Sequence, residues 1–342
     1  MTIKTAVVGF GLSATVFHIP FIQASPAFEL VAISSSQKDT IQKTLPGVAV
    51  YDSAESMIEH ADADLIIITA PNTAHYPLMH LALSHDKHVI IEKPFVTNVE
   101  QGEKILALSR SKNKVLAVFH NRRWDGDFLT VKHLLKAGSL GKVKYFESHF
   151  DRFRPQVQQR WREQPGEGSG ALFDLGPHLI DQALELFGPP EAVTARCLPL
   201  RDNAQTDDFF NLWLHYVDKE VVLQSSPFAS APPLRFHVQG TEASYLKYGL
   251  DPQENRLKQG VLPKGDDWCA EDPEAYGVLH QAEKQLVIPT QLGGYQHFFH
   301  NVAETIAGKA DLVVSVEEAL DSLKIIELAM QSTKLGNTIE IA

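Results

Sequence analysis

The sequence predicts two domains: an α/β domain built on a doubly wound parallel sheet, followed by an α+β domain with an open, largely antiparallel sheet. Three observations lead to this prediction. The chain has 342 residues, which is too long for one typical core. Short apolar runs alternate with helical patterns over residues 1–121. From residue 122 to residue 342, the strand-like runs alternate apolar and polar residues instead.

The first domain, residues 1–121, consists of strand–helix repeats. Its apolar runs are continuous, which is typical of strands buried on both faces of a parallel sheet. Helical stretches with short connections separate these runs, and this order indicates βαβ units. The expected strands are "KTAVVGF", "ELVAISSS", "VAVY", "DLIIIT", "HVIIEKP" and "KVLAVFHN", and the helices include "SAESMIEH", "PLMHLALSHD" and "NVEQGEKILALSRSKN".

The second domain, residues 122–342, begins with a helix, "DFLTVKHLLKAGSLG", that a glycine ends. Residues 249–294 are rich in Gly, Pro, Asp and Gln and are predicted to form a long loop region. Two helical patterns close the chain. The expected strands are "KVKYFESHFDRF", "EAVTARCL", "FFNLWLHYV", "EVVLQSS" and "LRFHVQG".

The composition excludes several classes of protein. A formal net charge of −11 argues against a nucleic-acid binder, since affinity for polyanions depends on basic patches. No run of 18 apolar residues exists, and the N-terminus lacks a signal-peptide pattern, so we expect no membrane partner. Cys197 and Cys269 lack CxxC spacing, so we expect no metal site, no disulfide framework and a cytoplasmic location.

A glycine-rich loop follows the first strand and predicts a dinucleotide site. Gly9, Gly11 and Ala14 form a G-x-G-x-x-A pattern between a strand and a helix, inside a βαβ unit. Gly9 permits the tight turn, Gly11 lets the backbone approach a pyrophosphate, and Ala14 allows close helix–strand packing. The helix N-terminus then faces the phosphates. The first domain is therefore predicted to be a Rossmann domain.

The second strand ends in "SSSQK", without the acidic residue that binds the ribose 2′-hydroxyl of NAD. The hydroxyls of Ser34 and Ser35, followed by the cation of Lys38, suit the 2′-phosphate of NADP better. NADP is therefore the expected cofactor, with NAD as the alternative. In a second interpretation, the serines only cap the next helix.

Three further residues suggest hydride-transfer chemistry. Lys93, in "IEKPF" after the fifth strand, can polarise a substrate oxygen. Asp174 and His178 lie at the start of the predicted helix in "GALFDLGPHLIDQALELFG", with Pro177 as its expected first residue. Oxidation of an alcohol needs a base for the hydroxyl proton, and histidine serves near neutral pH. A helix N-terminus would also keep the imidazole neutral. Taken alone, the acid and the histidine could be a helix cap and a core residue.

The motifs "GFGLSA", "EKP" and "DLGPHLID" together resemble the Gfo/Idh/MocA oxidoreductase family, over essentially the whole chain. The resemblance implies a Rossmann domain followed by an α+β domain, with Lys93, Asp174 and His178 as catalytic trio. It also implies a homodimer through the second-domain sheet, or a tetramer. Phe210, Trp213, Val221 and Leu223 are available to cover the free face of that sheet.

Longer strings, such as "VFHNRRWDGDFLT" and "ESHFDRFRPQVQQRWRE", resemble the NADP-dependent scyllo-inositol dehydrogenase subgroup and its uncharacterised bacterial relatives. By this pattern Asn72, His75 and Glu92, with Lys93, lie near the cofactor. Each expected substrate contact also has a structural interpretation, as core or ion pair. These contacts are Asn121, Arg123, Arg154, Trp161 and Tyr295.

The resemblance implies an oxidoreductase that moves a hydride between the nicotinamide and a secondary alcohol of a cyclic polyol or sugar, with scyllo-inositol or a related inositol as substrate. An aldose dehydrogenase and a non-catalytic NAD(P)-binding sensor are the alternatives. A hydrolase is disfavoured, because "GEGSG" is not a nucleophile elbow. The sequence leaves open whether Lys93 or His178 takes the proton first.

Overall fold

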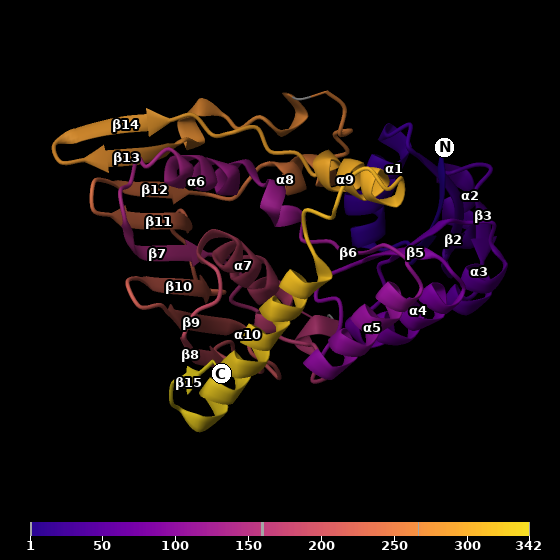
Figure 1. Ribbon diagram of the computed structural model, residues 1–342, viewed down its shortest axis with the longest axis horizontal. Coiled ribbons are helices and arrows are strands. Elements are labelled where there is room, and N and C mark those ends of the chain that lie inside the picture. The colour runs from indigo at the N-terminus through magenta and orange to yellow at the C-terminus, as the bar shows by residue number, and fades with distance from the viewer. Residues whose placement is uncertain (1, 159–160, 266, 342) are drawn as a thin grey trace. The chain divides into compact units, whose positions relative to one another are not determined.

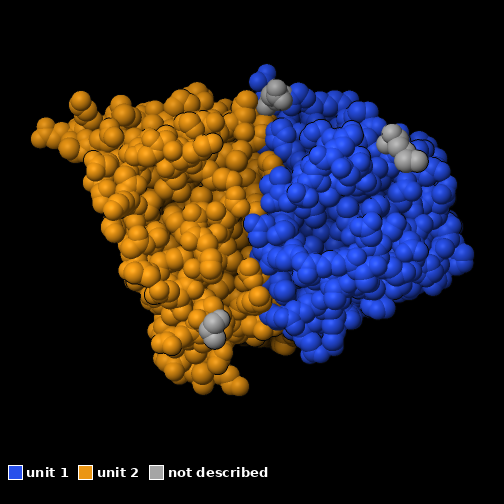
Figure 2. All heavy atoms as spheres, in the orientation of Figure 1, with its two compact units in different colours: residues 1–121, 253–268, 294–320 blue, residues 122–252, 269–293, 321–342 orange. Residues whose placement is uncertain are grey.

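The computed structural model describes residues 2–158, 161–265 and 267–341. The chain forms two compact units, which Figure 2 shows in different colours. The first contains residues 1–121, 253–268 and 294–320, and the second contains residues 122–252, 269–293 and 321–342. The first unit therefore takes in two later stretches that the predicted division at residue 121 does not include.

The first unit is built on a six-stranded sheet, in which all neighbouring strands are parallel, as predicted. The order β3-β2-β1-β4-β5-β6 is that of a Rossmann sheet. Since parallel strands end at the same edge, the loops after β1, β2, β4 and β5 share that edge. The strands are β1 Ile3–Val8, β2 Phe28–Ser34, β3 Ala49–Tyr51, β4 Leu65–Ile68, β5 His88–Ile91 and β6 Leu116–Val118.

Helices join these strands, and α4 and α5 lie side by side along the sheet (Figure 1). The first helical segment winds as a π-helix over η1 and continues as α1. No helix in the described part of the chain is long and apolar enough to cross a membrane. The helices of this unit include η1 Ser13–His18, α1 Ile19–Ala24, α2 Lys38–Thr44, α3 Ala54–His60, α4 Asn72–Ser84, α5 Val99–Ser111, α8 Gln253–Lys258 and α9 Gln296–Ile306.

An aromatic cluster joins α9 to the early part of the chain. Phe21 of α1 stacks on Phe299 with ring centroids 5.1 Å apart, and Phe119 meets Phe298 edge-on at 4.9 Å. All four side chains are buried. Residues from α9 therefore complete the core of the unit that contains the parallel sheet.

The second unit contains a nine-stranded sheet in the order β14-β13-β12-β11-β7-β10-β9-β8-β15. Among its described strands only β7 and β10 pair in parallel, so the sheet is largely antiparallel, as predicted. The strands are β7 Val143–His149, β8 Ala192–Leu198, β9 Phe209–His215, β10 Glu220–Ser225, β11 Leu234–Gly240, β12 Ser244–Tyr248, β13 Gly277–Gln281, β14 Lys284–Ile288 and β15 Ile339–Glu340. The helices are α6 Gly126–Lys136 and α7 Ala171–Phe187, with the short turns η3 Trp161–Glu163 and η5 Pro273–Ala275.

Within the described residues, three helical segments each begin in one unit and end in the other. They are η2 Asn121–Trp124, η4 Asp267–Cys269 and α10 Val316–Leu335.

The prediction of a long loop over residues 249–294 was wrong. This stretch contains α8 and a hairpin of β13 and β14, and β13 pairs with β12, which the sequence patterns also missed. The hairpin turn uses Ala282, with φ of +47°, followed by Glu283. Such turns usually contain Gly or Asn, so the sequence carried no signal for it.

Helix α7 packs on β9 and β10 on one face of the nine-stranded sheet (Figure 1). Phe210, Val221 and Leu223 are fully buried, so they cannot cover the opposite, outer face, and for these three residues the sequence-based assignment was wrong. Trp213 alternates with them and is 42% exposed. The alternation of side chains along a strand can be read from the sequence. The sequence does not tell which of the two alternating sets of side chains faces a helix.

His149, at the end of β7, is a buried cation between two carboxylates. Its Nδ1 lies 2.9 Å from Asp151 Oδ2 and its Nε2 lies 2.8 Å from Glu147 Oε1. Burial disfavours the imidazolium, but these hydrogen bonds outweigh it and raise the pKa of His149 to about 9. Because the folded pKa exceeds the unfolded value of about 6.5, this stabilisation is fully present below that pH and is lost as pH rises through about 9.

Replacing His149 by glutamine is therefore expected to lower the free energy of unfolding at neutral pH by about 2 kcal/mol. The difference from wild type should shrink between about pH 7 and 9.5. Urea unfolding across this range measures it. A difference that stays constant over the whole range would contradict a charged His149.

Candidate functional site

The glycine loop after β1 fits a dinucleotide. Gly9 has φ of +95°, and a Cβ at this position would lie 2.7 Å from Thr69 Oγ1. Its N–H donates to Ser34 O at 2.9 Å, which ties the loop to the end of β2. A Cβ on Gly11 would meet nothing within 4 Å, so the backbone there is open to a ligand. Ala14 is fully buried. The loop can therefore receive a pyrophosphate at the start of the following helix.

The segment after β2 presents an exposed cation beside this loop. Ser34 is buried and ends β2, whereas Lys38 is exposed and begins α2. Ser35 Oγ accepts the Gln37 N–H at 3.2 Å, and Gln37 Nε2 donates to Phe10 O at 3.1 Å. Gln37 is the N-cap of α2, and its own side chain makes no cap hydrogen bond. Ser35 bonds the N–H of this N-cap residue, so both interpretations of the serines stay predictions.

Glu92 connects the end of β5 to the first helix. It accepts hydrogen bonds from Ser13 Oγ and from His18 Nε2, the latter at 2.9 Å. His18 is fully buried, and its ring centroid lies 4.4 Å from that of Phe119. Lys93 follows directly, and the Lys93–Pro94 peptide bond is cis. The predicted cofactor residue Glu92 therefore fixes the segment that carries Lys93.

The charge on Glu92 is strongly stabilised. Burial alone would raise its pKa, but hydrogen bonds from His18 and Ser13, with the charges of His18 and Lys93, hold the pKa at about 2. Sequence reasoning missed both Ser13 and His18. The signal was a histidine in the apolar helical run "TVFHIPF", where a polar side chain needs a buried partner.

His75 and Asn72 support the same edge of the sheet. His75 is fully buried, with Nδ1 2.9 Å from Pro94 O and Nε2 2.9 Å from Ala70 O. Its imidazole thereby bridges the ends of β4 and β5, and burial lowers its pKa. Asn72 is buried at the first position of α4. Contact of either residue with a cofactor stays a prediction.

In the second unit, α7 begins earlier than predicted. Its first residue is Ala171, so Pro177 lies inside the helix and the expectation of a start at Pro177 was wrong. Asp174 is in the first turn and His178 is one turn further along, so both lie on one face of a formed helix. The helix macrodipole acts mainly within the first turn. His178 lies beyond the first turn of α7, so the macrodipole gives no reason for a neutral imidazole there.

Asp174 opens onto a pocket of about 120 Å³ within this unit. Its side chain is 32% exposed and lies 3.3 Å from Arg162 Nε. Arg154 is exposed and also lines the pocket, and its contact with a substrate stays a prediction. His178 is buried, with its ring 6.1 Å from that of Phe150. The pocket offers guanidinium donors and carboxylate acceptors. A hydroxyl group can accept a hydrogen bond from the first kind and donate one to the second.

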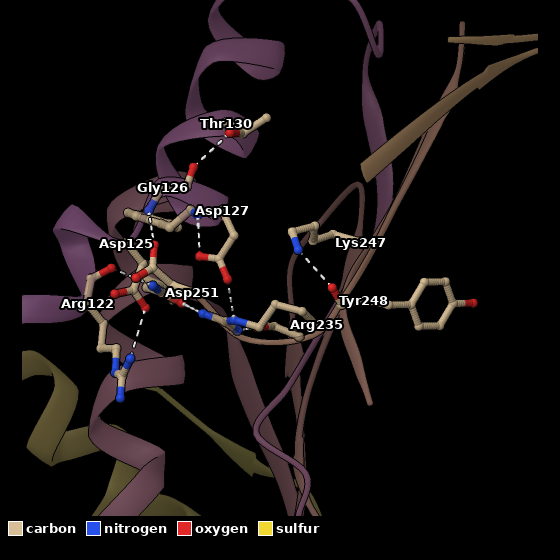
Figure 3. Close-up of polar contacts among 12 residues, drawn as sticks. Arg122, Asp125, Gly126, Asp127, Thr130, Arg235, Lys247, Tyr248 and Asp251 are labelled. Atoms are coloured by element: carbon tan, nitrogen blue, oxygen red, sulfur yellow. Dashed lines mark hydrogen bonds and ion pairs between the residues drawn. The ribbon is translucent and has the colours of Figure 1, made fainter. Parts of the chain in front are cut away.

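A buried polar network supports α6 and α7, and Figure 3 shows the part of it around Asp127, Arg235 and Asp251. Arg235 is fully buried and donates to Asp127 at 3.1 Å, to Ser148 at 2.7 Å and to Gln182 of α7 at 2.8 Å. Asp251 Oδ2 accepts the Gly126 N–H at 2.7 Å and so caps α6. Nearby, burial raises the pKa of Asp125 well above its usual range. The network fixes the helix that carries Asp174 and His178.

Other predicted substrate residues have structural partners. Arg123 pairs with Asp181 through two hydrogen bonds of 2.9 and 2.8 Å, and with Glu185 at 2.9 Å. Tyr295 is fully buried among the aromatic rings of the first unit, 6.4 Å from that of Phe17. Their roles toward a substrate stay predictions.

The last two predicted substrate contacts are less defined. Asn121 is buried at the start of η2. Trp161 begins η3, and its side chain lies outside the described part of the structure. Lys93 belongs to the first unit, and Asp174 and His178 belong to the second.

Comparison with known proteins agrees with this arrangement. Residues 3–120 match the family model "Oxidoreductase family, NAD-binding Rossmann fold", and residues 132–341 match "Oxidoreductase family, C-terminal alpha/beta domain", both of Gfo/Idh/MocA. The chain is 41% identical to the uncharacterised oxidoreductase YdgJ of Escherichia coli, covering 99% of both chains. It is 38% identical to the scyllo-inositol 2-dehydrogenase (NADP(+)) IolW of Bacillus subtilis, covering 99% of this chain and 96% of that one. The structure of the oxidoreductase yvaA from Bacillus subtilis is similar, with a TM-score of 0.96, 37% identity and coverage of 100% and 99%.

Proposed function

We propose that this chain, which belongs to the Gfo/Idh/MocA oxidoreductase family, is an NADP-dependent dehydrogenase that interconverts a secondary alcohol and a ketone on a cyclic polyol or sugar. The proposed substrate is scyllo-inositol or a related inositol. The observation that carries the proposal is the similarity, over nearly the whole chain, to a dehydrogenase of scyllo-inositol. The small pocket of guanidinium and carboxylate groups beside Asp174 supports it.

The residues of each unit have distinct roles in this proposal. Gly9, Gly11 and Ala14 seat the pyrophosphate of the cofactor. When bound, the nicotinamide supplies the carbon that accepts a hydride from the alcohol carbon. Lys93 donates a hydrogen bond to the reacting oxygen and lowers its pKa. During oxidation His178 accepts the hydroxyl proton, and loss of this proton together with the hydride converts the alcohol into the ketone. In the reverse direction His178 returns the proton to the substrate oxygen.

Asp174 assists from the first turn of α7, where it accepts a substrate hydroxyl or orients the substrate. Glu92 keeps Lys93 in place through its bonds to Ser13 and His18. Whether Lys93 or His178 takes the proton first is a question for pH–rate profiles of the single variants.

A screen of inositol isomers, their ketones and aldoses with NADPH and NADH tests the function. We expect turnover of an inositol or its ketone with NADPH. Preference for aldoses would identify a sugar dehydrogenase of the same family. No turnover of any polyol or sugar, despite tight binding of NADPH, would identify a sensor and contradict the proposal.

Cofactor preference rests on Lys38. Replacing Lys38 by glutamate is expected to lower kcat/KM with NADPH about 10-fold or more, because a carboxylate would repel the 2′-phosphate, and to change NADH kinetics little. Lys43→Glu, an exposed change at the other end of α2, is the control. A wild type that prefers NADH would contradict the assignment of NADP.

A homodimer that covers the outer face of the nine-stranded sheet, where Trp213 is exposed, completes the proposal. A tetramer is the alternative, and light scattering distinguishes the two. A cytoplasmic location also stays part of the proposal, because Cys197 and Cys269 form no disulfide.

A further inference from the structure

The first turn of α7 is held by a residue distant in sequence. The N-cap of α7 is Gly170, which has no side chain to cap the helix. Instead, Asp207 supplies two acceptors: its backbone oxygen accepts the Ala171 N–H at 2.8 Å, and its Oδ2 accepts the Leu172 N–H at 2.7 Å. Two of the N–H groups that a helix start leaves without partners are thus satisfied by one residue.

Gly170 and Asp207 fit closely together. Gly170 has φ of +94°, and a Cβ at this position would lie 2.0 Å from Asp207 Oδ1. Any larger residue would displace the carboxylate or strain the backbone. The start of α7 therefore depends on this contact. The position of Asp174, three residues after the first residue Ala171, depends on it as well.

Asp207 also lines the pocket onto which Asp174 opens. Burial raises the pKa of Asp207 to about 6, with help from the charge of Asp208, although the backbone N–H groups oppose this. A folded pKa above the unfolded value means that the ionised form costs stability as pH rises from about 4 to 6. The other charged or titratable groups near Asp207 are Arg152, Arg154, Arg162, Glu163, Asp174 and Arg201, which line the same pocket, and Cys197 of β8.

An asparagine could accept the same N–H bond without a buried charge. The charge nevertheless has an effect, since a hydrogen bond to a carboxylate is about twice as strong as one to a neutral oxygen, and a negative charge suits a helix N-terminus. A residue kept charged at a cost in stability, beside a predicted catalytic side chain, points to a role in function.

We propose that Asp207 is a positioning residue of the active site, which fixes the first turn of α7 and so places Asp174 and His178 for catalysis. The inference rests on the proposed function for its catalytic consequence. The contact that it describes lies entirely within the second unit.

The test compares Asp207→Ala, Asp207→Asn and a control, Asp202→Asn, at an exposed aspartate of the same loop. With the substrate found in the screen, Asp207→Ala should lower kcat/KM about 10- to 100-fold, because small misplacements of reacting groups are costly. Asp207→Asn should keep kcat/KM within about 3-fold, because the amide oxygen still accepts the Leu172 N–H.

Hydrogen exchange of residues 171–175 needs no substrate and separates the two proposals. We expect faster exchange in Asp207→Ala than in wild type, and protection in Asp207→Asn close to that of wild type, because the amide oxygen still accepts the Leu172 N–H. Equal protection in wild type and Asp207→Ala would overturn the inference, as would a loss of kcat/KM in Asp207→Asn as large as that in Asp207→Ala. If hydrogen exchange changes as expected but no polyol or sugar reacts, the proposed function is wrong. The inference that Asp207 fixes the first turn of α7 is then still supported.

Discussion

Replacing Lys93 by methionine is expected to lower kcat about 100- to 10,000-fold, because the reacting oxygen loses its charged hydrogen-bond donor. The side chain keeps its length, so the hydrogen bonds of Glu92 to Ser13 and His18 should remain and the thermal midpoint should change little. Steady-state rates with saturating NADPH and the ketone measure the effect.

Lys104→Met is the matched control, since Lys104 is an exposed lysine of the same unit whose pairing with Glu100 lies on the surface. His178→Gln should lower kcat over a similar range, because glutamine cannot accept the proton. A Lys93→Met enzyme with near-normal rates would refute the assignment of Lys93.

Arg235→Met should destabilise the protein by about 3–5 kcal/mol, the largest stability change that we expect. The guanidinium is fully buried and donates hydrogen bonds to Asp127, Ser148 and Gln182. Figure 3 shows Arg235 beside Asp127. Its removal would leave the Asp127 carboxylate without its cation in a dry interior. Urea or thermal unfolding measures the loss.

Arg196→Met, at an exposed position of β8, should change stability by less than about 0.5 kcal/mol. Because Gln182 belongs to α7, Arg235→Met should also lower activity below the unfolding temperature. A variant as stable as wild type would show that the network contributes specificity of structure and not stability.

The features that the sequence predicts well are local. The Gly9-x-Gly11 turn, the buried apolar strands and the alternating strands each depend on residues within about ten positions of one another. The parallel sheet, strands β7 to β11 of the second sheet and the position of Lys93 after β5 follow from such patterns.

The features that it missed depend on partners far along the chain. The start of α7 is set by Asp207, and helix propensity alone favours Pro177 as a first residue. The partner of Glu92 in the first helix, His18, is 74 residues away. The hairpin of β13 and β14 is stabilised by pairing with β12, although its turn has no characteristic residues. Tertiary contacts decide these cases, and a single sequence does not display them.

The aromatic cluster of the first unit has a consequence for how the protein is made. A ribosome that has synthesised residues 1–121 has completed all six strands of the parallel sheet but not α9, whose Phe298 and Phe299 cover Phe119 and Phe21. Those rings stay exposed to water, and to chaperones, until residues near the C-terminus emerge. The nucleotide-binding half of the molecule is therefore first in translation order but cannot finish folding first, and a gene fragment that ends at residue 121 would encode an incomplete core.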